Sequence, residues 1–282
     1  MASAKSRLLA VLEVFLIAFI VIPLLTLGIY RVFPAFETWQ TKTAGFAFPV
    51  FVDVLMVGVS VAMIYLRRKE MADYGLLFTP LKYHLGITAS CFIPVLLAGF
   101  PLGMGVDFKN WPGAILMAAI QIGLLFVLAL ILRKKPTAPN FGIAAALVFL
   151  PVFAFTGVSA WKAVALFLTY ALFVGFGEEI LYRGYMQSRL NEVFGHPYQF
   201  FGVAYGWGAI ITSLYFGLSH VGILGWMLGL STGVTLAWGI WTFFGGLVVG
   251  FVREKSGSIL APALLHGLPQ AIAVVAMLFL PI

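Results

Sequence analysis

The chain has little charge and almost no cysteine. Only 10% of its 282 residues are charged and 62% are hydrophobic, whereas a soluble domain is about half apolar and about a quarter charged. This shortage of charge excludes a soluble globular protein and indicates an integral membrane protein. Because Cys91 is the single cysteine, neither an internal disulfide nor a thiolate metal site can form, and its apolar neighbours predict a place in the core.

The net charge of +7 raises the question of nucleic-acid binding. The basic residues stand in short patches between apolar runs, however, which is typical of membrane-topology signals. We therefore expect the lipid bilayer as a partner and no nucleic acid. The N-terminus resembles a signal peptide, but its apolar run continues to Tyr30 without a clear small-residue cleavage site, so we interpret it as a first span.

The apolar runs predict an all-α, polytopic integral membrane bundle. A helix needs about 20 apolar residues to cross a bilayer, and the candidate spans are 8–30, 44–66, 85–106, 111–132, 141–158, 161–184, 205–228, 233–252 and 258–281. The fifth run is short and close to the sixth, so eight and nine transmembrane helices both stay open. We expect one continuous membrane domain, with N-terminal helices in residues 1–160 and the polar clusters described below in residues 161–282.

The Lys and Arg residues indicate the orientation of the nine-span version. With the N-terminus inside, the outer side holds only Arg31, Lys42, Lys109 and Lys162, and the other thirteen of the 17 basic residues lie on the cytoplasmic side. Cytoplasmic loops carry the excess of Lys and Arg in membrane proteins. The distribution therefore favours a cytoplasmic N-terminus.

Two adjacent glutamates and an arginine lie inside an expected span. Glu179 and Arg183 are four residues apart and share a helix face, so we expect a structural ion pair. Glu178 is rotated by about 100° from Glu179 and is the free carboxylate that would activate water. Charged groups at membrane depth are costly, and they are functional candidates by default. A purely structural polar lock and a proton relay through Glu178 are the alternatives.

Two further polar clusters follow toward the C-terminus. His220 interrupts an apolar span, where it either holds a water or a metal together with Glu178 or is hydrogen-bonded to a neighbouring helix. His266 and Gln270 are four apart and present two donors on one helix face, an arrangement that can stabilise an oxyanion. The alternative is a packing helix that Pro269 loosens beside His266, because proline lacks the amide hydrogen.

Helix geometry predicts a common depth for the three clusters. Glu178 and His266 lie about 18 Å and about 12 Å from the cytoplasmic ends of their helices at a rise of 1.5 Å per residue. His220 lies about 20 Å in if its span begins near residue 205, but near the outer face if the span begins at Gln199. A common depth would bring the clusters together and indicates hydrolytic chemistry inside the membrane.

The other titratable side chains are less informative. Glu13 and Asp53 lie in early spans, where each either lines a cavity or is an isolated, protonated carboxyl. His84 and His196 fall between spans, and we expect them to be solvated. The motifs HExxH, GxSG and GxGD are not found in the sequence, which argues against the zinc, rhomboid-like and aspartyl types of intramembrane protease.

The three clusters together resemble the CAAX prenyl protease type II and bacteriocin-processing family (CPBP or Abi family) of intramembrane endopeptidases. That family is marked by EExxxR, FxxxH and HxxxN on separate helices. Here the motifs are Glu178-Glu179-Ile-Leu-Tyr-Arg183, Phe216-Gly-Leu-Ser-His220 and His266-Gly-Leu-Pro-Gln270. The resemblance covers roughly residues 161–281. Gln270 departs from the pattern, because it stands where the family has Asn and carries its amide one methylene further out.

The resemblance implies an all-helical membrane protease whose cavity opens toward the cytoplasm, with residues 161–282 as its catalytic core. By motif position, Glu178 and His220 would activate the water, and His266 and Gln270 would bind the oxyanion. Eukaryotic members remove the last residues of prenylated CaaX proteins. We therefore expect an endopeptidase of a prokaryotic cell membrane that cleaves near the C-terminus of membrane-anchored proteins or peptides, with prenylated CaaX-type and other substrates both open.

The resemblance leaves the cofactor and two rival functions open. Its family has been called both metalloprotease and glutamate-dependent protease, and Glu178, His220 and His266 are also a candidate ligand set for a divalent metal such as zinc. A proton-coupled membrane transporter and a non-catalytic bacteriocin-immunity protein are the alternative functions. The sequence has no evident repeat of broken helices, which argues against the transporter.

Overall fold

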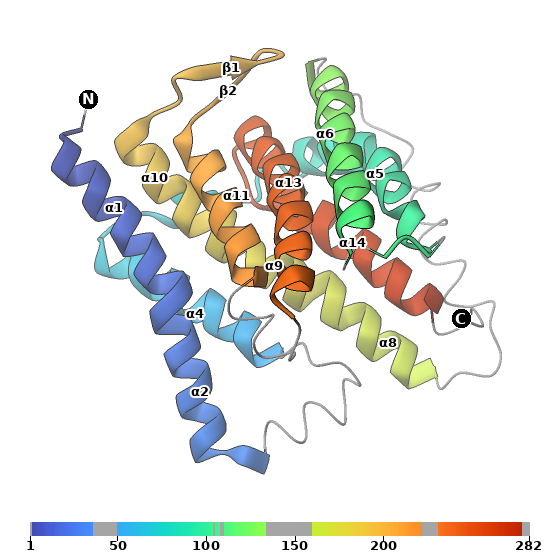
Figure 1. Ribbon diagram of the computed structural model, residues 1–282. Helices are drawn as coiled ribbons and strands as arrows, with labels where there is room; N and C mark the ends of the chain where they lie inside the picture. Colours follow the sequence, from blue (N-terminus) through green and yellow to red (C-terminus); the bar gives the residue numbers. More distant parts are fainter. Residues whose placement is uncertain are drawn as a thin grey trace.

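The chain folds into a bundle of helices with one short hairpin (Figure 1). A computed structural model describes residues 2–35, 50–103, 105–107, 110–133, 160–221 and 231–277. The α-helices are α1 (Ala4–Leu16), α2 (Ile22–Val32), α4 (Val50–Leu66), α5 (Leu81–Gly103), α6 (Trp111–Arg133), α8 (Ala160–Leu168), α9 (Gly175–Glu179), α10 (Gln187–Phe194), α11 (Trp207–Ser219), α13 (Thr232–Ser256) and α14 (Leu260–Met277). The π-helical segments η1 (Ile17–Val21), η3 (Thr169–Val174) and η4 (Ile180–Met186) and the 3-10 turn η2 (Met71–Tyr74) stand between them.

The helix lengths agree with a membrane bundle. Within the described ranges, five helices are long and apolar enough to cross a membrane: Ala4–Val32, Leu81–Leu102, Trp111–Arg133, Ala163–Phe194 and Thr232–Ser256. Shorter apolar helices cover Val50–Leu66, Trp207–Ser219 and Leu260–Ala276. The expected span 141–158 lies outside the described residues, so the choice between eight and nine spans stays a prediction, as does the orientation.

The helix that carries Glu178 is longer and less regular than the expected span 161–184. It runs through α8, η3, α9, η4 and α10 as far as Phe194, and π-helical turns stand on both sides of α9. Such wide turns are frequent at functional sites. A similar turn, η1, precedes Pro23 in the first turn of α2, because proline cannot donate to the regular hydrogen-bond ladder.

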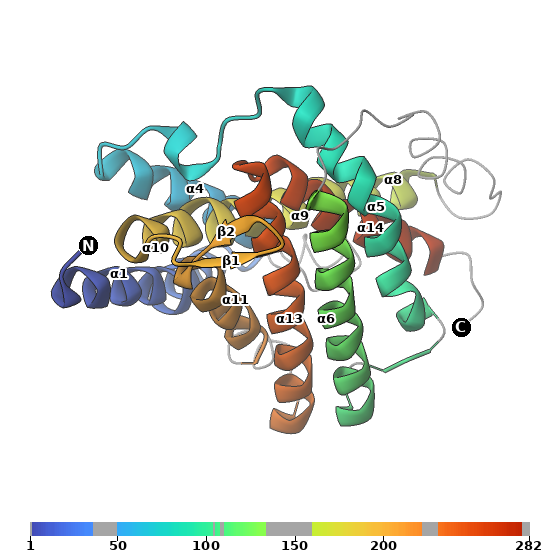
Figure 2. The same ribbon diagram turned by 90° about the horizontal axis from the view of Figure 1, so that it is seen from above.

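A two-stranded hairpin, which the all-α prediction missed, connects α10 to α11. β1 (Tyr198–Phe200) pairs antiparallel with β2 (Val203–Tyr205). Phe201 and Gly202 turn the chain with φ angles of 49° and 80°, in the left-handed region that glycine adopts without strain. Figure 1 and Figure 2 show the hairpin at the end of the bundle where α10 ends and α11 begins.

The hairpin decides where the helix of His220 begins. Gln199 belongs to β1, and α11 begins at Trp207. His220 therefore lies about 20 Å along the helix, as expected for a start near residue 205. The alternative start at Gln199 is wrong.

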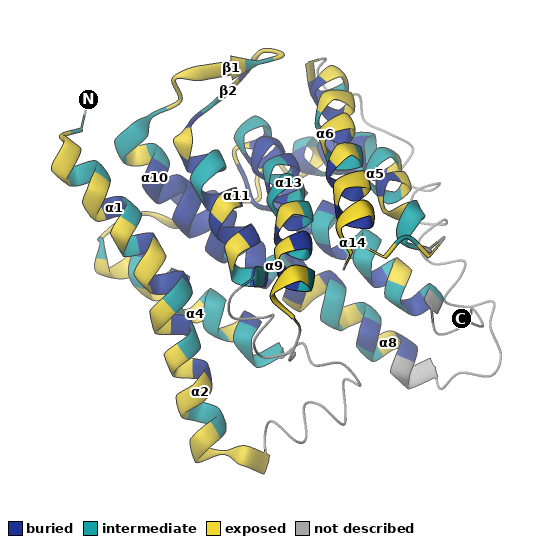
Figure 3. Cartoon of the chain, in the orientation of Figure 1, coloured by how far each residue is buried: buried dark blue, intermediate teal, exposed yellow. Residues whose placement is uncertain are grey.

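Buried side chains concentrate on the central helices. Figure 3 shows buried residues along α9, α10 and α11 and exposed residues on the outward faces of α1, α2 and α6. The outward faces carry large apolar side chains, as a surface in contact with lipid tails requires. Cys91 is fully buried in the core between α5, α6, α13 and α14, which confirms its expected role in packing.

The two loop histidines differ in their surroundings. His84 lies in α5 and is only 3% exposed, so the expectation of a solvated loop is wrong. The reason is that α5 begins at Leu81, before the expected span, and the imidazole packs beside the ring of Tyr83. The side chain of His196 is 41% exposed, and its Nε2 lies 3.1 Å from Oε2 of Glu254.

Candidate active site

Two glycines let the helix that carries Glu178 cross α14 at close range. A Cβ atom on Gly175 would lie 2.8 Å from the carbonyl oxygen of Ala263 and 2.9 Å from Cα of Gly267. A Cβ atom on Gly267 would lie 2.7 Å from a backbone oxygen of η3. Small residues of this kind allow two membrane helices to approach backbone to backbone. The crossing places α9, with its glutamates, against the part of α14 that carries His266.

Glu179 has partners on two helices. Its Oε1 accepts a hydrogen bond from Nη1 of Arg183 at 3.1 Å and lies 2.9 Å from Nδ1 of His266 on α14. Both side chains of the Glu179–Arg183 pair are fully buried. The contact expected from the four-residue spacing is therefore present. The second contact, to His266, is one that spacing along a single helix does not reveal.

Arg183 connects the glutamates to two further helices. Its Nη2 donates to the carbonyl oxygen of Gly246 on α13 at 3.0 Å. Its guanidinium carbon lies 4.8 Å from the centroid of the Phe216 ring on α11, a distance typical of a cation–π contact. A Cβ atom on Gly246 would lie only 3.2 Å from Nη2, so the glycine leaves room for the guanidinium. Arg183 thus holds η4, α11 and α13 together around a buried charge.

His266 lies between the two adjacent glutamates. Its Nδ1 contacts Oε1 of Glu179, and its Nε2 lies 3.7 Å from Oε2 of Glu178. The side chains of His266 and Glu178 are 14% and 6% exposed. The structure therefore brings the first and third sequence clusters together in one buried group.

His220 stands at the C-terminal end of α11, and its own helix orients the ring. The Nδ1 atom lies 2.8 Å from the carbonyl oxygen of Phe216. A carbonyl can only accept, so the proton of the neutral ring is on Nδ1 and Nε2 is left as an acceptor. Trp238 on α13 packs edge-on against the imidazole, with centroids 4.9 Å apart. Within the described chain, no direct hydrogen bond joins His220 to Glu178.

Phe216 packs between the polar residues of the site. Its ring centroid lies 4.8 Å from that of His220, 5.9 Å from that of His266 and 5.0 Å from that of Tyr182. The guanidinium of Arg183 also lies over this ring and makes an electrostatic contact with it. Phe216 was visible in the sequence only as the first letter of FxxxH. In the structure it is the spacer that sets the distance between the two histidines.

Gln270 and Pro269 lie one turn beyond His266. Helix α14 continues through Pro269 to Met277, so the proline does not end the helix. Gln270 is partly buried, and its Oε1 has no hydrogen-bond partner among the described residues. An oxyanion would bind to the NH₂ group of this amide rather than to Oε1, and the oxyanion role of Gln270 stays a prediction.

Asp53 is a further carboxyl close to the cluster. It lies on α4, is 1% exposed, and interacts electrostatically with Glu178. The sequence marked Asp53 only as a cavity-lining or isolated carboxyl.

The candidate metal ligands do not form a metal site in the described part of the chain. No group of three or more His, Cys, Asp or Glu side chains there is arranged to hold a metal ion. The reason lies in the two histidines: His266 is engaged by both glutamates, and His220 is turned by its bond to the backbone of α11. Glu178, His220 and His266 therefore do not fit a metal in this arrangement.

Glu13 is not an isolated carboxyl, because it belongs to an ionic network at one end of the bundle. Its two oxygens lie 3.3 Å from Nη1 of Arg67, and Nε of Arg189 donates to Oε2 at 3.0 Å. The hydroxyl of Tyr185 also donates to Glu13. Arg67 in turn lies 3.0 Å from Glu192. The network joins α1, the end of α4 and α10, and we call this end of the bundle the basic end.

Tyr74 completes the network at the basic end. Its hydroxyl donates to Oε1 of Glu192 at 2.9 Å and accepts from Nε of Arg67 at 3.3 Å. Burial raises the pKa of Tyr74 to about 12, although the hydrogen bond from Arg67 acts in the opposite direction. The hydroxyl therefore stays protonated and keeps donating at neutral pH.

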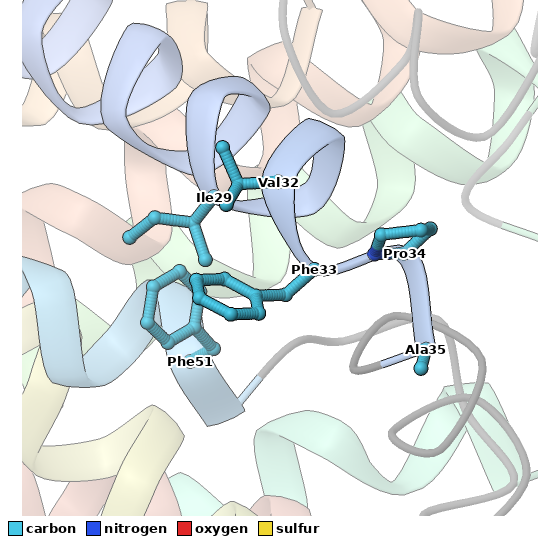
Figure 4. A pocket seen from close by; sticks show the side chains of 6 residues that line it. All are labelled: Ile29, Val32, Phe33, Pro34, Ala35 and Phe51. Carbon is cyan, nitrogen blue, oxygen red and sulfur yellow. The ribbon is translucent and has the colours of Figure 1, made fainter.

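A cavity of about 550 Å³ lies elsewhere, between the end of α2 and the start of α4 (Figure 4). Its lining consists of apolar side chains: Ile29, Val32, Phe33, Pro34, Ala35 and Phe51. None of the clustered polar residues contributes to it. This cavity offers no acid, base or nucleophile and is not the candidate active site.

Residues 159–272 match a family model described as type II CAAX prenyl endopeptidase Rce1-like. The matched segment contains every candidate site residue, namely Glu178, Glu179, Arg183, His220, His266 and Gln270. The resemblance read from the motifs is therefore confirmed. The family implies protease activity of the CAAX type on membrane-anchored proteins. Searches of curated proteins and of solved structures found no match to the chain.

Proposed function

Because residues 159–272 match the model of the type II CAAX prenyl endopeptidase Rce1-like family, we propose that this protein hydrolyses a peptide bond near the C-terminus of a membrane-anchored, prenylated CaaX-type protein. The observation that carries the proposal is the contact of Glu178 and Glu179 with the two ring nitrogens of His266. Two carboxylates and an imidazole, buried together, are suited to proton transfer.

The first step is the activation of a water molecule. Nε2 of His220 is an acceptor, because Nδ1 donates to the backbone, and Glu178 presents a second acceptor. A water that donates to both groups is polarised, and Glu178 takes its proton while the hydroxide attacks the carbonyl carbon of the scissile bond. A single positioned base of this kind contributes about 10²–10⁴-fold to the rate.

The second step stabilises the tetrahedral intermediate. Glu179 accepts from Nδ1 of His266 and so orients the ring, and the two carboxylates beside it stabilise the imidazolium, in which Nε2 also carries a proton and donates to the oxyanion. The amide of Gln270, one turn further along α14, supplies a second donor. The intermediate then collapses as the C–N bond breaks, and Glu178 passes its proton to the leaving amine nitrogen. The products are a new carboxyl terminus and a released peptide.

The test is cleavage of a quenched fluorescent farnesylated CaaX peptide by the purified protein in detergent. Glu178→Gln keeps the shape of the side chain but removes the base, so we expect kcat/KM to fall by roughly 10²–10⁴-fold. Glu70→Gln is the matched control, because Glu70 is exposed and lies between α4 and η2, and it should cleave as the wild type does. The same peptide without its farnesyl group measures how much the lipid contributes.

Several outcomes would contradict the proposal. A wild-type protein that cleaves neither peptide lacks the expected activity. A Glu178→Gln variant with near-normal turnover would show that Glu178 is not the base. Loss of activity with a chelator and its return with zinc would require a metal that the arrangement of the described residues does not accommodate. Melting curves of each variant separate loss of catalysis from loss of fold.

A further inference from the structure

Asp53 reaches the candidate site from a helix outside the matched segment 159–272. Helix α4 packs across α9 at Gly177, the residue before Glu178. A Cβ atom on Gly177 would lie 2.6 Å from Cβ and 3.2 Å from Cγ of Asp53. No side chain larger than hydrogen fits there. The glycine therefore lets the Asp53 carboxyl pack directly against the backbone beside Glu178.

Asp53 and Glu178 also lie at the same depth in the bundle. Arg67 follows Asp53 by fourteen residues, Glu192 follows Glu178 by fourteen residues, and these two side chains are paired at 3.0 Å at the basic end. Because α4 packs beside the helix of Glu178, both carboxyls stand about 21 Å from that pair at 1.5 Å per residue.

Among the described residues, no hydrogen-bond donor stabilises a negative charge on the Asp53 carboxyl. It is 1% exposed, and neither oxygen has a hydrogen-bond partner in the described part of the chain. The guanidinium of Arg183, the cation paired with the glutamates of the site, is already engaged by Glu179 and by a backbone oxygen. An ionised carboxylate buried without partners is far more costly than the neutral acid. Asp53 is therefore a carboxylic acid with a proton to donate.

The groups that face Asp53 leave few acceptors for this proton. Glu178 on α9 and the hydroxyl of Tyr170 on η3 both interact with it electrostatically. Of the other elements that contact α4, η4 contributes Tyr185, whose hydroxyl donates to Glu13, and Tyr182, whose hydroxyl is hydrogen-bonded to Ser219. Helix α2 contributes Tyr30, which packs on Phe51, and η2 contributes Tyr74, which is bound at the basic end. The remaining charged residues of α2 and η2, Arg31 and Asp73, are exposed.

We propose that Asp53 is a positioning residue of the hydrolytic site, a neutral carboxylic acid whose O–H donates to the attacking water, which in turn donates to the ionised carboxylate of Glu178. The proton stays on Asp53 while Glu178 works as the base, so the two groups act as a pair with different roles. This inference rests on the proposed function for its kinetic consequence, but the protonated acid and its coupling to Glu178 exist without any substrate.

Infrared difference spectroscopy tests the acid directly, without turnover. A protonated carboxyl has a carbonyl stretch distinct from that of a carboxylate, and pH jumps on the purified protein reveal it. We expect the wild type to show a protonated-acid band at neutral pH that is missing in Asp53→Asn and displaced in Glu178→Gln. A spectrum unchanged by Asp53→Asn, or an Asp53 band unaffected by Glu178→Gln, overturns the proposal even if no peptide is cleaved.

The pH profile of kcat/KM tests the positioning role. Asn and Leu have the size of Asp, but only Asn can donate. Asp53→Asn should therefore keep most of the activity, whereas Asp53→Leu should lower kcat/KM by roughly ten- to hundredfold, as expected for loss of a hydrogen bond to a charged group, and move the acid limb of the profile to higher pH. Ser60→Ala is the matched control, because Ser60 is buried on the same face of α4 and its hydroxyl donates to the carbonyl oxygen of Met56 in its own helix.

The two readouts separate the failure of this inference from that of the proposed function. Equal losses in Asp53→Asn and Asp53→Leu with an unmoved acid limb would mean a purely structural role and overturn the inference, while the protease assignment would stand. An inactive wild type with intact infrared coupling would contradict the protease and leave the Asp53–Glu178 pair in place.

Discussion

The buried Glu179–Arg183 pair offers the sharpest test of what holds the candidate site together. We consider Arg183→Met, which keeps an unbranched side chain of similar length but removes the charge. Arg183 is fully buried and loses three contacts in this variant: Glu179 at 3.1 Å, the carbonyl oxygen of Gly246 at 3.0 Å and the face of the Phe216 ring. Glu179 would then be a buried carboxylate whose remaining partner is His266.

The expected loss of stability comes from the carboxylate of Glu179, which stays buried without its cationic partner. Removing one partner of a buried ion pair costs about 3–5 kcal/mol, most of it because the other charge stays desolvated. We therefore expect the free energy of unfolding to fall by about that amount. The double variant Glu179→Gln/Arg183→Met removes both charges and should cost less than the sum of the single variants, since residues in contact are not additive.

The assay is denaturant-induced unfolding in mixed micelles, with Arg189→Met as the matched control. Arg189 lies on the same long helix and pairs with Glu13, whose side chain is 21% exposed and keeps Arg67 as a partner. Its loss should cost only about 1 kcal/mol, as for other partly solvated pairs. If Arg183→Met unfolds at the same denaturant concentration as Arg189→Met, the reasoning that Arg183 neutralises a buried charge is refuted.

Two further predictions concern the helix crossing and the basic end. Gly267→Ala places a methyl group 2.7 Å from a backbone oxygen of η3, so it should lower cleavage and reduce the free energy of unfolding by about 1–3 kcal/mol. Gly99 has open space around it, so Gly99→Ala should leave the melting curve unchanged. Equal effects of the two variants would contradict the close helix crossing. Tyr74→Phe tests linkage: because the pKa of Tyr74 is raised to about 12, its neutral hydroxyl contributes fully below about pH 10, and this stability is lost as the pH rises from 10 toward 12. The gap in unfolding free energy between wild type and Tyr74→Phe should therefore narrow over that interval, and a constant gap would contradict the role of burial.

The membrane class, most helix positions and the three motifs could be predicted from the sequence. Long apolar runs form helices in a bilayer, because each backbone amide must be hydrogen-bonded within its own segment. The spacing of Glu179 and Arg183 required a shared face of one helix, and their contact is present. These are local properties, set by the covalent order of residues and the pitch of the helix.

Local patterns failed where partners come from other segments. His84 is buried rather than solvated because α5 begins earlier than its hydropathy indicates. Glu13 is a network residue because Arg67 and Arg189 reach it from two other helices. The hairpin between α10 and α11 is too short to show an alternating pattern, yet it decides where α11 begins.

The arrangement of the site itself was decided by tertiary structure. Periodicity along one helix predicted Arg183 as the partner of Glu179 and predicted no partner for Glu178. The close crossing of α9 and α14 at their glycines brings His266 between both glutamates. Gly177 likewise admits Asp53 from a helix more than a hundred residues away in sequence. Composition and periodicity determine which side chains enter the membrane on which helix face. Only the packing of backbones at small residues determines which of those faces meet, because the distance between two helices depends on both of them at once.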